Sequence, residues 1–215
     1  MKAKWVLFLI IYITVLTFAL LIWLNTRYTS RILQEGDRFV FRGSYGKFEI
    51  TVSRKDAKNR LLTLEGKNIG GFSFYQFTAT ISYRKRFLEL QGITASGLEM
   101  VDCVVGEDGN RFLFVPIKRW ARKNKEYTFR VACTEGNFLF MDHMKQEKPH
   151  ILTTPAGEFS VVAIQHTITY PFQEEILGWG TFFFAPSLGF PVKIDIVIEG
   201  VSYPLLLENF HLSSR

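Results

Sequence analysis

The chain begins with one long uncharged apolar run and continues with short segments in which apolar and polar residues alternate. Residues 5–24 contain no charged residue, glycine or proline. At about 1.5 Å rise per residue in a helix they span about 30 Å, the thickness of the hydrocarbon core of a bilayer. Trp5 and Trp23 lie at the two ends, where their rings favour the membrane interface. The pattern predicts one N-terminal transmembrane helix.

We expect this helix to be retained and not removed as a signal peptide. The apolar core of a signal peptide has about 7–15 residues and is followed by small residues at the cleavage site. Here the run is longer, and Asn25, Thr26, Arg27 and Tyr28 follow it. The positive charges on its two sides nearly balance, but the short tail before it resembles the start of a signal sequence. That tail favours a cytoplasmic N-terminus, with the rest of the chain outside the cytoplasm.

Beyond residue 36 the apolar pattern changes to alternation with a period of two. Phe48, Ile50 and Val52 alternate with polar residues, and the apolar residues of segment 192–198 follow the same period. This period predicts half-buried β-strands. Turn residues separate the strand candidates at short intervals, and no long segment with helical periodicity follows the first one. We therefore predict a mainly β fold, a curled antiparallel sheet or half-barrel.

Length and charge fit one domain behind a membrane anchor. The chain has 215 residues and a net charge of +6, and the part after the anchor is long enough for one sizeable domain. The predicted organisation is an anchor over residues 1–24, a polar connector over 25–36 and an extracytoplasmic β domain over 37–215. A mild positive charge suits contact with anionic lipid or another envelope polyanion. A tethered β domain argues against a nucleic-acid partner.

Phenylalanine is unusually frequent, with 21 residues, and it recurs in Phe-x-Phe pairs. In a strand, the two members of such a pair face the same side. A Phe-rich core explains this, and so does a concave sheet face lined with rings that holds an acyl chain or another apolar ligand. The candidate lining residues are Phe72, Phe74, Phe77, Phe112, Phe114, Phe182 and Phe184.

A basic run over residues 118–125 contains Trp120. An aromatic ring at the membrane interface beside cations at the phosphates would let this run contact anionic headgroups. The alternative is an ordinary solvated helix or loop. The residues concerned are Lys118, Arg119, Trp120, Arg122 and Lys123.

Two cysteines, Cys103 and Cys133, lie in strand-like segments of the predicted extracytoplasmic part. A disulfide between them and two small buried thiols both fit, because sequence spacing alone does not bring two strands together.

No familiar catalytic motif occurs in the sequence. It lacks a G-x-S-x-G elbow, an H-E-x-x-H helix, a C-x-x-C pair and a P-loop. Its four histidines, His143, His150, His166 and His211, lack the spacing of a metal site. We therefore expect neither an enzyme nor a cofactor or metal, although a hydrolase of envelope polymers is kept as a third alternative.

Residues 153–212 resemble part of a known family. The segments T-T-P-A-G-E-F, W-G-T-F-F-F-A-P-S-L-G-F-P and L-L-L-E-N-F-H-L are similar to those of exported bacterial proteins of unknown function with a curved sheet like that of lipoprotein carriers. Pro155 and Gly157 form a turn before a strand, and Ala185–Gly189 is a tight connection. The motif marks a fold, and the resemblance implies a lipid-binding concavity only by analogy.

These observations favour a membrane-anchored cell-envelope binding protein that holds a lipid or another apolar ligand. Membrane lipid and an envelope protein are the expected partners. The alternative is a ligand-free scaffold or assembly subunit of an envelope complex.

Overall fold

The computed structural model of the chain describes residues 31–44, 46–69, 76–84, 87–96, 101–105, 124–133, 136–170, 176–198 and 200–214. The predicted anchor and the basic run around Trp120 lie outside these residues. Among the residues that are described, no helix is long and apolar enough to cross a membrane.

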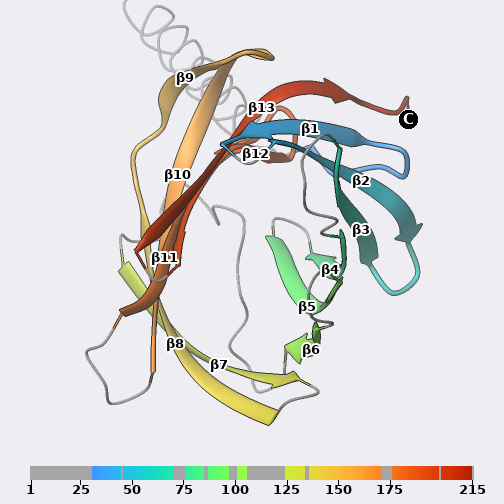
Figure 1. The fold of residues 1–215 in the computed structure, drawn as a ribbon. Helices are drawn as coiled ribbons and strands as arrows, with labels where there is room; N and C mark the ends of the chain where they lie inside the picture. Colours follow the sequence, from blue (N-terminus) through green and yellow to red (C-terminus); the bar gives the residue numbers. More distant parts are fainter. Residues whose placement is uncertain are drawn as a thin grey trace, which may run out of the picture.

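The described residues form thirteen strands in one sheet (Figure 1). Their bounds are β1 Arg38–Gly43, β2 Gly46–Asp56, β3 Leu61–Asn68, β4 Gln76–Arg84, β5 Phe87–Ser96, β6 Val101–Val105, β7 Asn124–Cys133, β8 Gly136–Gln146, β9 His150–Thr154, β10 Gly157–Thr169, β11 Ile176–Ala185, β12 Phe190–Ile198 and β13 Val201–His211. Every described ladder is antiparallel. The predicted mainly β, antiparallel architecture is confirmed.

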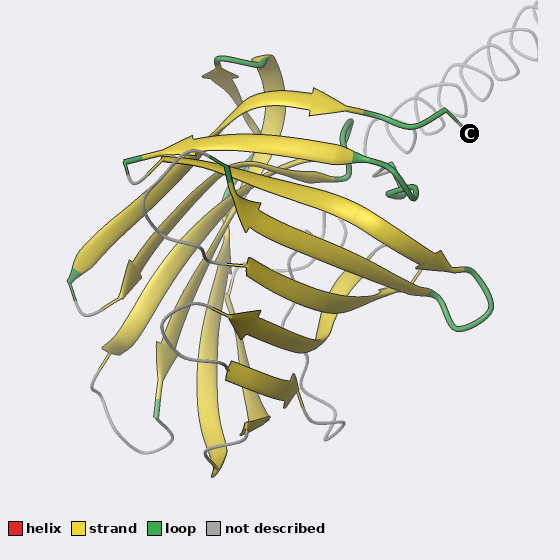
Figure 2. Cartoon of the chain, turned by 45° about the vertical axis from the view of Figure 1, so that its right-hand side comes forward, coloured by secondary structure: helices red, strands yellow, loops and turns green. Residues whose placement is uncertain are grey.

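The strand pairings form a closed circuit, which the predicted half-barrel would not have. The order runs from β11 through β12, β13 and β1 to β8, continues to β10, and β10 pairs again with β11. Strand β10 makes this possible through its length. Its first part pairs with β9, whereas its second part lies between β8 and β11. Figures 1 and 2 show the strands curving around a common centre.

One face of the sheet, which we call the inner face, carries the buried alternate residues. Directly opposite residues of an antiparallel pair share a face, so the register traces this face from strand to strand. From β8 to β13 the inner face carries Met144, His166, Ile164, Phe182, Ile194 and Leu205. From β1 to β4 it carries Phe39, Ile50, Gly66 and Phe77, each opposite the next. The buried core contains the large side chains of this face, among them Phe39, Phe41, Val52, Leu62, Phe184, Val192 and Leu207.

The segment that precedes β1 is fastened onto the sheet. Leu33 is buried in the core, and the backbone amide of Arg31 donates to the carbonyl of Pro186 (2.8 Å). The carbonyl oxygen of Arg31 lies where a Cβ at Gly189 would be, so this crossing requires a glycine, whose φ is also +70°. The structure thus holds Arg31 against the β11–β12 turn, and the amide of Gly36 donates to the carbonyl of Val52 in β2. The domain boundary predicted at residue 37 stays a prediction.

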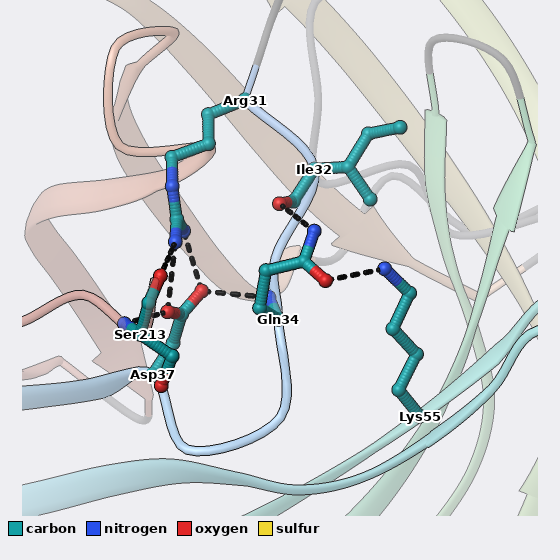
Figure 3. A network of polar contacts seen from close by, with 6 residues as sticks. All are labelled: Arg31, Ile32, Gln34, Asp37, Lys55 and Ser213. Carbon is teal, nitrogen blue, oxygen red and sulfur yellow. Dashed lines mark hydrogen bonds and ion pairs between the residues drawn. The ribbon is translucent and has the colours of Figure 1, made fainter. Parts of the chain in front are cut away.

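Asp37 is the centre of a polar network that joins the two ends of the described chain (Figure 3). Its fully buried carboxylate accepts two hydrogen bonds from the Arg31 guanidinium and one each from the amides of Gln34 (2.7 Å) and Ser213 (2.9 Å). Burial alone would raise the pKa of Asp37, but these hydrogen bonds and the charge of Arg31 hold that pKa below its ordinary value. The network fixes where the chain enters and leaves the sheet.

Candidate functional site

The inner face of β13 stays apolar beyond the buried core and becomes exposed at one end. Leu207 is fully buried and Leu205 is half-buried, whereas Tyr203 and Val201 are 40% and 43% exposed. All four residues share one face because they alternate along the strand. Tyr203 lies opposite Ile196 of β12, so the apolar face continues onto the neighbouring strand.

Strand β10 ends at the same edge of the sheet. Tyr170 follows its last residue, is 36% exposed and stacks on Phe140 of β8, with ring centroids 5.8 Å apart. We call Tyr170, Val201 and Tyr203 the apolar rim. The rim exposes large apolar side chains to water at the place where the apolar inner face extends beyond the core. Such exposure is typical of a contact surface for an apolar partner or ligand.

Beside the rim, β11 presents two glycines on the inner face. Gly180 lies opposite His166 of β10 and Ile196 of β12, and Gly178 lies opposite Ile168 of β10. We call Gly178 and Gly180 the glycine strip. Glycine weakens a strand interior and often marks a place where a ligand or another chain approaches the backbone. The strip is therefore a row without side chains that lies between His166 and Ile168 of β10 on one side and Ile196 of β12 on the other.

A buried polar pair borders the glycine strip. His166 and Asp142 are 1% and 2% exposed, and His166 Nδ1 lies 2.7 Å from Asp142 Oδ2. A carboxylate oxygen accepts, so this contact is a hydrogen bond in the tautomer of His166 that carries its proton on Nδ1. The ring of Phe182 meets the imidazole edge-on, with centroids 5.5 Å apart. In the part of the chain that the structure describes, Asp142 Oδ1 has no hydrogen-bond partner.

This arrangement suits binding more than catalysis. The rim and the strip offer an apolar surface that continues from the core, and the buried Asp142 carboxylate lies beside it, opposite Ile168. Among the described residues, no group of three or more His, Cys, Asp or Glu side chains could hold a metal ion.

The predicted lining residues fall into two groups. Phe72, Phe74, Phe112 and Phe114 lie outside the described residues. The other three are on the inner face: Phe184 is fully buried, Phe182 is nearly so, and half-buried Phe77 stacks on Phe48 with centroids 5.6 Å apart. Phe182 alone borders the glycine strip, and Phe184 lies deeper in the core.

The remaining predicted site residues are only partly described. Lys118, Arg119, Trp120, Arg122 and Lys123 lie outside the described residues. Cys103 and Cys133 lie directly opposite each other in the β6–β7 ladder, and the disulfide between them stays a prediction.

The rim, the strip and the Asp142–His166 pair were not predicted from the sequence. The signal for the rim was present, because Val201, Tyr203, Leu205 and Leu207 occupy alternate positions in the sequence. The signal for the strip was the sequence Gly178-Trp179-Gly180, because two glycines at positions i and i+2 face the same side of a strand. Nothing local pairs Asp142 with His166, since the β8–β10 register alone brings them together.

Comparison with known proteins identifies a fold. No protein-family model and no curated protein matches the sequence. A crystal structure of an exported protein with a YmcC-like fold from Bacteroides fragilis is similar over 86% of this chain and 99% of that one, with 12% sequence identity and a TM-score of 0.52. A lipoprotein from Parabacteroides distasonis matches over 83% of this chain and 96% of its own, with 12% identity and a TM-score of 0.45. The chain therefore shares its fold with the Bacteroides protein.

Proposed function

We propose that the chain is a membrane-anchored cell-envelope binding protein that holds an acyl chain along the glycine strip. Residues 1–24 are the anchor in this proposal, residues 25–36 connect it to the sheet, and the β domain works outside the cytoplasm. The observation that carries the proposal is the apolar rim, which continues the inner face of the core into solvent beside two strand glycines. The description of the Bacteroides fragilis neighbour as an exported protein supports the envelope setting.

The chemistry of the strip favours a flexible, narrow apolar ligand. Ile168 and Ile196 flank a row without side chains, and a methylene chain is thin enough to lie against the backbone. Each buried CH₂ contributes about 0.8 kcal/mol, so even a part of an acyl chain would bind measurably. The tyrosines of the rim combine an apolar ring with a polar hydroxyl, which suits a boundary between lipid and water.

The rim and the connector lie at opposite ends of β11. The connector contacts Pro186, directly after the last residue of β11, whereas Gly178 lies near its first residue. Eight residues of strand separate them, about 26 Å at 3.3 Å per residue. The rim therefore lies at the end of β11 opposite to the contact between Arg31 and Pro186, and in the proposed setting the ligand exchanges with a partner or surface on the side of the rim.

A binding titration with matched variants tests the proposal. Full-length protein in detergent is titrated with a dansyl-labelled long-chain fatty acid, and the fluorescence of the probe is measured. We expect Val201→Asp and Tyr203→Asp to weaken binding at least about tenfold, because a carboxylate would replace apolar surface at the contact. Ile151→Asp is the control, since Ile151 is 65% exposed on β9, away from the rim. Equal affinity in all variants would reject the site.

The scaffold alternative is favoured by one observation, the complete burial of Phe184 within a packed core. A scaffold would use the apolar rim as a docking surface for an envelope protein. In that case the dansyl probe would not bind, and the Tyr203→Asp variant would lose a protein partner that the Ile151→Asp variant retains.

A further inference from the structure

A cysteine pair lies in the shortest ladder among the described strands. β6 and β7 share three register pairs, Cys103 with Cys133, Val104 with Ala132 and Val105 with Val131. Directly opposite residues of an antiparallel pair share a face and have Cα atoms about 4.5–5.5 Å apart. Disulfides join residues whose Cα atoms are usually about 4.4–6.8 Å apart. The backbone register therefore meets the distance requirement for a bond between these two residues.

We propose that Cys103 and Cys133 form a disulfide that closes the strand circuit between β6 and β7. The proposal rests on the extracytoplasmic placement given under Proposed function, because disulfides persist in oxidising compartments. It is independent of whether the domain binds an acyl chain.

The bond forms by thiol–disulfide exchange. The thiolate of one cysteine attacks the disulfide of a thiol oxidase or of oxidised glutathione, forms a mixed disulfide and releases one thiol. The second cysteine thiolate then attacks the protein sulfur of the mixed disulfide and releases the other thiol. The two cysteines together lose two protons and two electrons, and the oxidant is reduced from one disulfide to two thiols.

The position gives this bond a mechanical role. Every other described ladder has at least four register pairs, so the junction between β6 and β7 has the fewest backbone pairs to hold it. A bond across this junction also restricts the unfolded chain, because the two cysteines are 30 residues apart in the sequence. We expect the double variant Cys103→Ser/Cys133→Ser to lower Tm by roughly 5–15 °C.

The first test traps the thiols of the full-length protein in cells. Cells are quenched with acid, and the denatured protein is treated with a maleimide polymer without reductant, then again after reduction. We expect no shifted band before reduction and a doubly shifted band after it. A doubly shifted band before reduction would overturn the proposal.

The second test separates geometry from compartment. Purified full-length protein is equilibrated in glutathione buffers of increasing oxidised fraction, beside the variant Cys103→Ser/Val104→Cys, which moves one cysteine by one residue onto the other face. We expect the native pair to oxidise in buffers at least about 100-fold more reducing than the shifted pair needs. Equal behaviour would overturn the proposal through its geometry. If the native pair forms a disulfide in buffer but is reduced in cells, the proposed extracytoplasmic placement of the domain is wrong. The acyl-chain titration tests ligand binding separately and does not depend on either result.

Discussion

His166 Nδ1 lies 2.7 Å from Asp142 Oδ2, and both side chains are buried beside the glycine strip. The two residues come from β10 and β8, and their neighbours on the inner face are apolar. Burial of a polar pair in such surroundings costs desolvation energy that only good geometry offsets. The pair is thus a fixed polar feature of the fold, and Asp142 Oδ1, which has no hydrogen-bond partner among the described residues, is an acceptor beside the proposed ligand site.

Removing one partner of this pair should be worse than removing both. Asp142→Ala takes away the acceptor of the His166 ring and should lower the free energy of unfolding by roughly 3–5 kcal/mol. The double change Asp142→Leu/His166→Phe replaces both with apolar groups and should cost clearly less. Urea unfolding of the full chain in detergent measures both values. A single variant as stable as the parent would contradict the buried geometry.

Asp37 should make the protein sensitive to acid. The pKa of its carboxyl lies below the ordinary value of 3.8 in the folded state, so on acidification the unfolded state takes up a proton first. The contribution of Asp37 to the free energy of unfolding is complete at pH values above 3.8. It is lost as the pH falls from 3.8 through the lowered pKa of the folded state. Asp37→Asn should flatten the curve of unfolding free energy against pH below about pH 4.

The control for Asp37 is Asp195→Asn on β12. Its carboxylate pairs with Lys193 at 2.8 Å in a partly exposed position, so the change should alter stability by less than about 1 kcal/mol. Parallel pH curves for Asp37→Asn and the parent protein would refute the role of the Arg31–Asp37–Ser213 network.

Core and rim should respond differently to truncation. Phe184→Ala removes a fully buried ring and should lower the free energy of unfolding by about 3–5 kcal/mol. Tyr203→Ala removes a ring that is 40% exposed, so the loss should be smaller, about 1–2 kcal/mol, while binding of the acyl probe weakens. If Tyr203→Ala destabilised the fold as much as Phe184→Ala, the rim would be part of the core and not a contact surface.

Gly66 and Phe77 should be energetically coupled. The ring of Phe77 lies directly over Gly66, with its Cε1 atom 2.1 Å from the position that a Cβ would take. Gly66→Ala should therefore displace the ring and cost about 1–3 kcal/mol. In a Phe77→Ala background the same change should cost much less, which a double-mutant cycle measures. Additive costs would mean that the ring does not cover Gly66.

The local features of the fold were predictable from the sequence. Alternation identified the strand at 192–198, and Pro155 and Gly157 marked the turn between β9 and β10. Ring closure was not predictable, because it depends on β10 pairing with β9, β8 and β11 along different parts of its length. Such non-local pairing leaves no signal in the periodicity of any single strand.

The burial of charged residues could not be predicted from the sequence either. Asp37 and Glu49 are acids in a strand-rich segment, where exposure is the ordinary expectation, yet both are buried. Asp37 accepts hydrogen bonds from nearby Arg31 and from distant Ser213. Glu49 pairs with Arg38 and Lys67, which the sheet places on the two strands beside it, β1 and β3. For the candidate site, Phe182 and Phe184 of one Phe-x-Phe pair lie buried on the inner face of β11, and the exposed part of the inner face is marked by Tyr203 of β13.

The central claim is that the apolar rim meets an acyl chain, and in-cell photo-cross-linking tests it most directly. A photoreactive amino acid is placed at position 203 of the full-length protein, with position 151 as the matched exposed control on β9. After irradiation of living cells, the mass of the purified protein is measured. The account predicts a lipid-sized adduct at position 203 and none at position 151. A protein adduct at position 203, or the same result at both positions, would contradict it.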